Sequence, residues 1–208
     1  TAPPQAAAIM LPLLCAADLV GLRNYIGRWN RAVLRTMLMG GMAGIALGAL
    51  SFGKLDANGL RLMVGAIAIV FSVYYFIGNR VSRAPADPSV RRGLFWSALS
   101  GYTSFVAHAG GPPAMAYLIP QRMEKMTYVA TMNGFFMTMN MVKLVPYSLL
   151  GQFDAHTLMT SLLLLPLVPV GVRAGQWLQG KINHFWFYQL AQVCLLVSGL
   201  QLVWMALR

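Results

Sequence analysis

Long apolar stretches alternate with short polar connections along the whole chain. A membrane-spanning helix needs about 20 apolar residues to cross the hydrocarbon core. No stretch shows the strict alternation that is typical of a membrane β-barrel strand. The pattern therefore predicts an all-α integral membrane protein with seven spans, over residues 6–22, 33–52, 58–78, 94–120, 127–149, 157–178 and 185–207.

Composition and charge agree with this interpretation. The 208 residues are 58% hydrophobic and 10% charged, whereas roughly 25% of the residues of a soluble domain are charged. The net charge of +11 comes mainly from basic residues between the spans, where they act as orientation signals rather than as a nucleic-acid surface. The positive-inside rule places the most basic loop, with Arg23, Arg28, Arg31 and Arg35, in the cytoplasm.

An internal repeat is indicated by two similar segments, residues 44–56 and 171–183. Equivalent glycines, a lysine and an Asp/Asn position are all 127 positions apart. Internal duplication is a common way to build transporters. We therefore expect an N-terminal repeat over 1–78, a cytoplasmic basic linker over 79–93 and a C-terminal repeat over 94–208. By the same offset, the partner of segment 94–120 would precede residue 1, so the first repeat is expected to be truncated at its start.

Segment 94–120 is interrupted by a run of poor helix formers: His108, Ala109, Gly110, Gly111 and Pro112. Such a break at membrane depth persists only where protein or a polar cavity covers it. The start of the second half-helix would offer unpaired N–H groups and a partial positive charge, which suit an anion. A packing kink is the alternative. The segment either crosses the membrane or re-enters it, and the distribution of basic loops favours a re-entrant hairpin.

Three ionisable residues and one amide in the spans are further candidates. Lys143 is costly inside a span and shares a helical face with Asn140, which predicts substrate contact or a structural ion pair. Asp18 either couples transport to protons, as the acid counterpart of Lys143, or pairs with Arg23. Arg173 either gates or contacts substrate, or extends to the lipid headgroups.

Catalytic motifs are not apparent in the sequence. It contains no recognisable nucleophile–base pair, nucleotide-binding loop or metal-ligand spacing. We therefore expect a protein that is not an enzyme and needs no cofactor or resident metal.

These features together resemble the TauE/SafE family of sulfite and organosulfonate exporters. The resemblance rests on Leu11-Pro12 before Asp18 and a basic loop with Trp29, on Gly44 and Gly48, on Gly101 before Ala109-Gly110-Gly111-Pro112, and on Asn140, Lys143, Tyr147 and Gly151. It implies a multi-pass protein of the bacterial inner membrane with about eight segments and an earlier glycine-rich stretch. It also implies secondary transport of a small oxyanion.

The leading hypothesis is export of sulfite or an organosulfonate, with the anion bound by His108–Pro112, Asn140 and Lys143 and its charge balanced by Lys143. The expected partners are this anion, protons and the lipid bilayer, and no nucleic acid. One alternative is a cation or neutral-solute permease that uses Asp18 as the ligand. The other is a membrane scaffold subunit without transport activity. The sequence does not indicate an oligomeric state.

Overall fold

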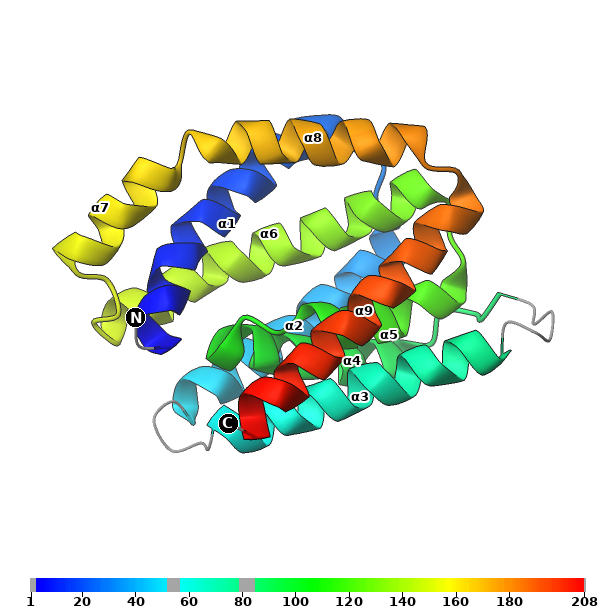
Figure 1. Ribbon diagram of the computed structural model, residues 1–208, viewed down its shortest axis with the longest axis horizontal. Helices are drawn as coiled ribbons and strands as arrows, with labels where there is room; N and C mark the ends of the chain where they lie inside the picture. Colours follow the sequence, from blue (N-terminus) through cyan, green and yellow to red (C-terminus); the bar gives the residue numbers. More distant parts are fainter. Residues whose placement is uncertain (1–2, 52–56, 79–84, 208) are drawn as a thin grey trace. The chain divides into compact units, whose positions relative to one another are not determined.

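The computed structural model describes residues 3–51, 57–78 and 85–207 (Figure 1), and these ranges contain helices and no strand. The predicted all-helical fold is therefore confirmed. The repeat positions Gly53, Lys54 and Asp56 and the linker residues 79–84 lie outside the described residues. The elements are α1 (Pro3–Tyr25), α2 (Arg31–Leu50), α3 (Ala57–Gly78), α4 (Val90–Ala107), α5 (Gly111–Leu118), the short 3₁₀ helix η1 (Ile119–Gln121), α6 (Lys125–Leu149), α7 (Ala155–Leu164), α8 (Leu167–Lys181) and α9 (His184–Leu207).

Most predicted spans match one helix to within a few residues, but two differ. Segment 94–120 is divided into α4, α5 and η1. Segment 157–178, expected as one helix, is divided into α7 and α8, whose axes differ by 47°. Pro166 stands at this bend and starts α8. A proline inside a helix removes a backbone donor and clashes with the preceding turn, which explains the break.

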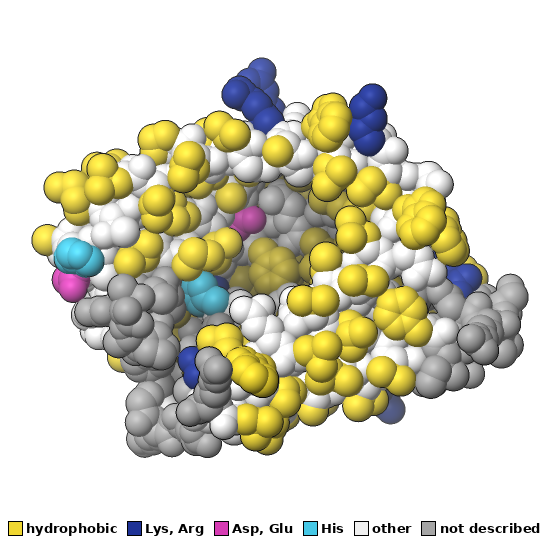
Figure 2. Space-filling view, in the orientation of Figure 1, with side chains coloured by type: hydrophobic (Ala, Val, Ile, Leu, Met, Phe, Trp, Pro, Cys, Tyr) yellow, Lys and Arg dark blue, Asp and Glu magenta, His cyan; other side chains and the backbone are white. Residues whose placement is uncertain are grey.

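Three helices in the described ranges are long and apolar enough to cross a membrane: Ala8–Tyr25, Arg31–Leu50 and Phe185–Leu207. The bent pair α7–α8 makes a fourth span if it crosses as one. Leu and Val side chains are widely exposed, and hydrophobic side chains cover much of the visible surface (Figure 2). Several Ser, Thr, Asn and Gln side chains, and one Lys, are buried. An apolar exterior over buried polar groups is the distribution expected of a membrane protein.

The chain divides into two compact units. The first unit combines Thr1–Leu34 with Met126–Asn183, and the second combines Arg35–Lys125 with His184–Arg208. These units group residues by contact, whereas the expected halves 1–78 and 94–208 group them by sequence similarity. The repeat thus stays a prediction.

In the second unit, glycines bring α2 and α4 into close parallel contact. A Cβ on Gly40 would collide with Ser97, and one on Gly44 would collide with the carbonyl oxygen of Ala98. Further along, a Cβ on Gly48 would lie 3.0 Å from the Phe105 ring. Helix α3 packs along α9, and α5 packs against α3, α4 and α9. This packing positions the break between α4 and α5.

Candidate functional site

Helices α4 and α5 form a hairpin in which the chain turns back on itself. Near the turn, the Ser100 hydroxyl donates a hydrogen bond to the carbonyl oxygen of Gly110, over 2.6 Å. At the other end, the Tyr117 hydroxyl lies 3.4 Å from the carbonyl oxygen of Ser89, directly before α4 begins. The start of α4 and the end of α5 therefore lie at the same level, so the segment folds back after its break.

Side chains of α4 satisfy the carbonyl groups of the turn. His108 adopts the left-handed conformation, with φ of 52°, and ends α4. The Ala109 N–H donates to the carbonyl oxygen of Thr103, and the Thr103 hydroxyl donates to the Ala109 carbonyl oxygen at 3.1 Å. Together with the bond from Ser100 to Gly110, these contacts satisfy the carbonyl groups of Ala109 and Gly110 with donors from α4.

The two glycines of the break have different roles. A Cβ on Gly110 would lie 2.7 Å from the Ser104 Cβ and 2.8 Å from the Ser100 carbonyl oxygen, so only glycine allows this approach to α4. A Cβ on Gly111 would meet nothing within 4 Å. The space beside Gly111 is therefore open at the start of α5.

The start of α5 offers fewer donors than the sequence pattern suggested. Pro112 and Pro113 occupy its first turn, and neither has a backbone N–H. The N–H groups of Gly110 and Gly111 are thus the donors that remain at this end of the helix. The half-helix start is consequently a narrow, two-donor feature rather than a full set of four free N–H groups.

In the first unit, α1 and α6 bring together an acid, a base and two amides. The Asp18 carboxylate accepts a 2.7 Å hydrogen bond from Asn140 Nδ2 and a 3.4 Å bond from Asn133 Nδ2. The Lys143 side chain is completely buried, and it interacts electrostatically with Asp18 and Cys15. The predicted shared face of Asn140 and Lys143 thus meets Asp18, and this pairing offsets part of the cost of a buried charge.

Asp18 faces the amides of α6, and its role in proton coupling stays a prediction. Its carboxylate is directed to the α6 amides, while Arg23 is exposed. Within the described ranges, no ion pair joins Asp18 and Arg23. Arg173 is exposed on α8, which fits extension toward the headgroups, and its role in gating stays a prediction.

The candidate residues therefore form two groups, one in each unit. His108, Ala109, Gly110, Gly111 and Pro112 lie together in the hairpin of the second unit. Asp18, Asn140 and Lys143 lie together in the first unit.

Sequence reasoning missed the residues that support these groups. Ser97, Ser100, Thr103 and Ser104 are buried along one side of α4. Their spacing of three and four residues in an otherwise apolar helix is the signal that could have identified them. Asn133 on α6 is a further such residue: its amide donates to Asp18, and its Oδ1 has no hydrogen-bond partner among the described residues.

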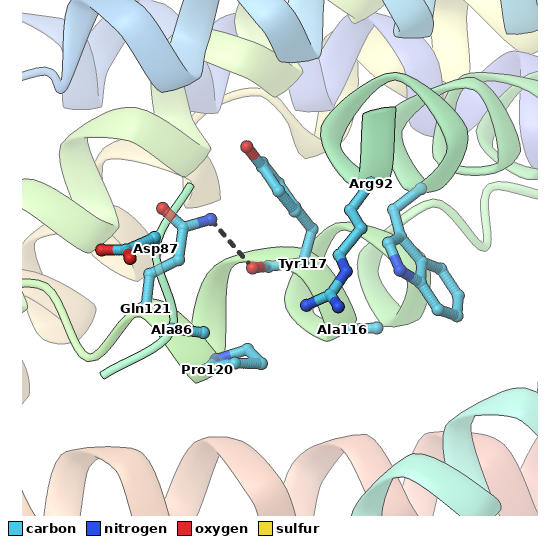
Figure 3. Close-up of a pocket in the computed structure, with 8 residues that line it drawn as sticks. Ala86, Asp87, Arg92, Ala116, Tyr117, Pro120 and Gln121 are labelled. Carbon is cyan, nitrogen blue, oxygen red and sulfur yellow. Dashed lines mark hydrogen bonds between the residues drawn. The ribbon is translucent and has the colours of Figure 1, made fainter. Parts of the chain in front are cut away.

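A pocket of about 230 Å³ lies at the base of the hairpin (Figure 3). Asp87 and Arg92 reach it from the linker end and the start of α4, with Tyr117 between them in the view. The Gln121 amide donates to the carbonyl oxygen of Tyr117 at 2.9 Å and closes one side. Its remaining lining residues are Ala86, Trp96, Ala116 and Pro120. Both charged residues are exposed, so the pocket belongs to the surface of the second unit.

Comparisons with known proteins identify a family. Neither the curated proteins nor the solved structures contain a match to this chain. The family model for the sulfite exporter TauE/SafE matches residues 1–202, which is nearly the whole sequence and agrees with the resemblance seen in its motifs. This chain therefore belongs to the TauE/SafE sulfite exporter family, a family of membrane transporters.

Proposed function

We propose that this protein is a secondary transporter that exports a small oxyanion, sulfite or an organosulfonate, across the bacterial inner membrane, which it crosses several times. Family membership supports transport of this class of solute. The single observation that carries the proposal is Lys143, a completely buried cation in the apolar helix α6. Ionisable residues at such depth are rare and mark solute or proton pathways.

The hairpin supplies neutral donors for the anion. The N–H groups of Gly110 and Gly111 would bind its oxygen atoms, and the open space beside Gly111 would admit it. The hydroxyls of Ser100 and Thr103 hold the carbonyl oxygens of the turn, which would otherwise repel an anion. His108 and Pro112 shape the turn on either side of these donors.

The first unit supplies charge and coupling. While Asp18 is ionised, its carboxylate balances Lys143, and little net charge remains to attract an anion. Protonation of Asp18 would remove a negative charge from beside Lys143 and increase the attraction of this region for an anion, so a proton and the anion would bind together. Cys15 is a second titratable group that interacts with Lys143. An inside-negative potential then favours export by about 2.3 kcal/mol per net negative charge per 100 mV.

Flux through purified protein in liposomes tests this function. Labelled sulfite should leave or enter the liposomes faster than labelled sulfate, and a pH gradient should change its rate. Liposomes without protein provide the background. If sulfite, sulfoacetate and taurine all move at the background rate, the proposed function is wrong.

Variants of the charged pair then assign the mechanism. Lys143→Met combined with Asp18→Asn removes both charges and leaves neither partner buried alone, so it should fold and lose anion flux. Asp18→Asn alone mimics the protonated acid; once size-exclusion chromatography has verified that it folds, it should retain flux while losing the effect of the pH gradient. Arg23→Gln, an exposed charge change on the same helix, serves as the matched control. Retained sulfite flux in the double variant would show that neither charge of the Asp18–Lys143 pair is needed to carry the anion.

A further inference from the structure

Two buried polar side chains lie in the seam between α3 and α9, away from both groups described above. Ser72 and Gln192 are each 0% exposed. Within the described ranges, the Ser72 Oγ and both polar atoms of the Gln192 amide have no hydrogen-bond partner. Gln192 also lies inside the apolar span Phe185–Leu207. Polar groups buried without partners are costly and are rarely retained without a reason.

The register of the two helices places these side chains opposite each other. Helices α3 and α9 run antiparallel, since Gly65 lies beside Val203 while Ile69 lies beside Gly199. At their closest approach, a Cβ on Gly65 would be 2.7 Å from the Gly199 carbonyl oxygen. Ser72 comes seven residues after Gly65, and Gln192 comes seven residues before Gly199. Both therefore lie about two turns farther along the same seam.

The predicted repeat relates the polar pair to the glycine pair. The 127-residue offset aligns Gly65 with Gln192 and Ser72 with Gly199. At the glycine pair, the absence of side chains allows the two backbones to approach closely. Sequence-equivalent positions two turns away carry an amide and a hydroxyl instead. Close packing of the helices does not require these polar groups, so their chemistry calls for another explanation.

The seam also runs beside the second half of the hairpin. Helix α5 packs against both α3 and α9. Ala109, before α5, clusters with Val64 and Leu202, whereas the Tyr188 hydroxyl donates to the Met123 carbonyl oxygen beyond η1. Gln192 is one helical turn from Tyr188. The polar pair therefore lies along the hairpin, toward the end opposite to its turn.

We propose that Ser72 and Gln192 form a polar station for a small oxygen-bearing solute, water at rest and the oxyanion in transit. The Gln192 amide supplies two N–H donors and Ser72 supplies one O–H donor. Because these donors are neutral, they bind an oxyanion without the fixed positive charge that would hold it too tightly to leave. The identity of the anion rests on the proposed function, whereas the access of polar solutes to the seam does not.

Cysteine accessibility tests the station. In a background with Cys15→Ala and Cys194→Ala, Ser72→Cys is close to isosteric and should fold, as size-exclusion chromatography can verify. In proteoliposomes, a negatively charged methanethiosulfonate reagent should modify Cys at position 72 at least about tenfold faster than at a dry apolar position, because lipid and packed side chains exclude charged reagents. Leu195→Cys, on the same buried stripe of α9 and 1% exposed, is the matched control.

Protection of the introduced cysteine by an anion tests whether the station binds oxyanions. Methanesulfonate should slow modification of Ser72→Cys; sulfite is unsuitable because it consumes the reagent. Gln192→Cys repeats the measurement from the facing helix. Equal, slow modification at positions 72 and 195 would overturn the station, and modification without protection would overturn its binding of oxyanions. A protected Cys at position 72, together with an absence of sulfite flux through the protein with its native Cys15, Cys194 and Ser72, would refute the proposed function and leave the station standing.

Discussion

The two glycine motifs that predicted the repeat have different surroundings in the structure. In α2, Gly44 and Gly48 are buried against α4, and Gly44 is so close that a Cβ would collide with the Ala98 backbone. In α8, the equivalent Gly171 and Gly175 are exposed, and a Cβ on either would meet nothing within 4 Å. The same spacing of small residues thus makes a helix contact in one place and an open face in the other.

This difference shows what a glycine motif does and does not determine. Small residues at intervals of four make a helix surface flat enough for a second backbone to approach. Whether an approach occurs depends on which helix is available, and for α2 that helix is α4, whose Gly101 faces the backbone of Gly41. The glycine pattern therefore predicts the capacity for close packing, and the tertiary structure supplies the partner.

The largest expected loss of stability comes from adding a side chain to the packed glycine motif of α2. Gly44→Ala should destabilise the protein by about 3 kcal/mol, because the new methyl group meets backbone atoms that cannot rotate away. Thermal unfolding of the detergent-solubilised protein, followed by size-exclusion chromatography, measures the loss. Gly171→Ala, at the equivalent position of α8, is the matched control. Equal melting temperatures for the two variants would contradict the close contact of α2 with α4.

The two glycines of the break between α4 and α5 also differ, because Gly110 is packed against α4 and Gly111 has open space beside it. Gly110→Ala should cost about 2 kcal/mol and disturb the hairpin, since its Cβ would press on Ser104 and the Ser100 carbonyl. Gly111→Ala should leave stability almost unchanged, because the neighbouring space is open. If the anion uses that space, Gly111→Ala should still lower sulfite flux. Melting temperature and flux, measured on both variants, separate packing from binding, and an unstable Gly111→Ala protein would contradict this assignment.

Alanine in the exposed glycine motif of α8, Gly171 and Gly175, should change stability in the opposite direction. Gly175→Ala is expected to raise stability by up to about 1 kcal/mol, because alanine favours the helical conformation more than glycine does. A rise of about 3 °C in the melting temperature is the corresponding signal. A clear decrease would show instead that this face of α8 contacts another segment or a second copy of the chain.

The smallest effect concerns the start of α7, the helix that precedes the exposed glycine motif of α8. The Thr157 N–H donates to the Asp154 carboxylate at 2.7 Å and lowers the pKa of Asp154 below its ordinary value of 3.8. A lowered pKa contributes stability above pH 3.8 that is lost as the pH falls through the folded-state value. Asp154→Asn keeps a capping oxygen and should remove this acid dependence. Identical pH profiles of melting temperature for both proteins would contradict it.

Much of the fold followed from the sequence, because helix length and hydrophobicity are local properties. The apolar stretches located α1, α2, α3, α6 and α9 to within a few residues. The division of 157–178 was missed, although Pro166 lies in it, because a proline in a membrane helix can be tolerated as well as break the helix. The fold-back of α5 depends on contacts with α4, and these contacts join distant parts of the segment.

The sequence predicted which residues belong to the candidate site better than it predicted the contacts between them. The cost of a charge in a span was enough to single out Lys143 and Asp18, and their helical spacing linked Lys143 with Asn140. The contribution of Asn133 to Asp18, and of Ser100 and Thr103 to the turn, required coordinates. Hydrogen bonds between helices depend on rotation and register, which the hydrophobic pattern of a single helix leaves open.

The sequence by itself determined that this chain is a helical membrane protein with a broken segment, a charge within an apolar stretch and the motifs of the TauE/SafE family. These properties follow from residue type and spacing, which act within one helix. Only the tertiary structure decided which glycine motif is packed, that α5 returns along α4, and that the antiparallel packing of α3 and α9 brings Ser72 and Gln192 to the same level. The reason is that such pairings depend on the relative register of helices far apart in the chain.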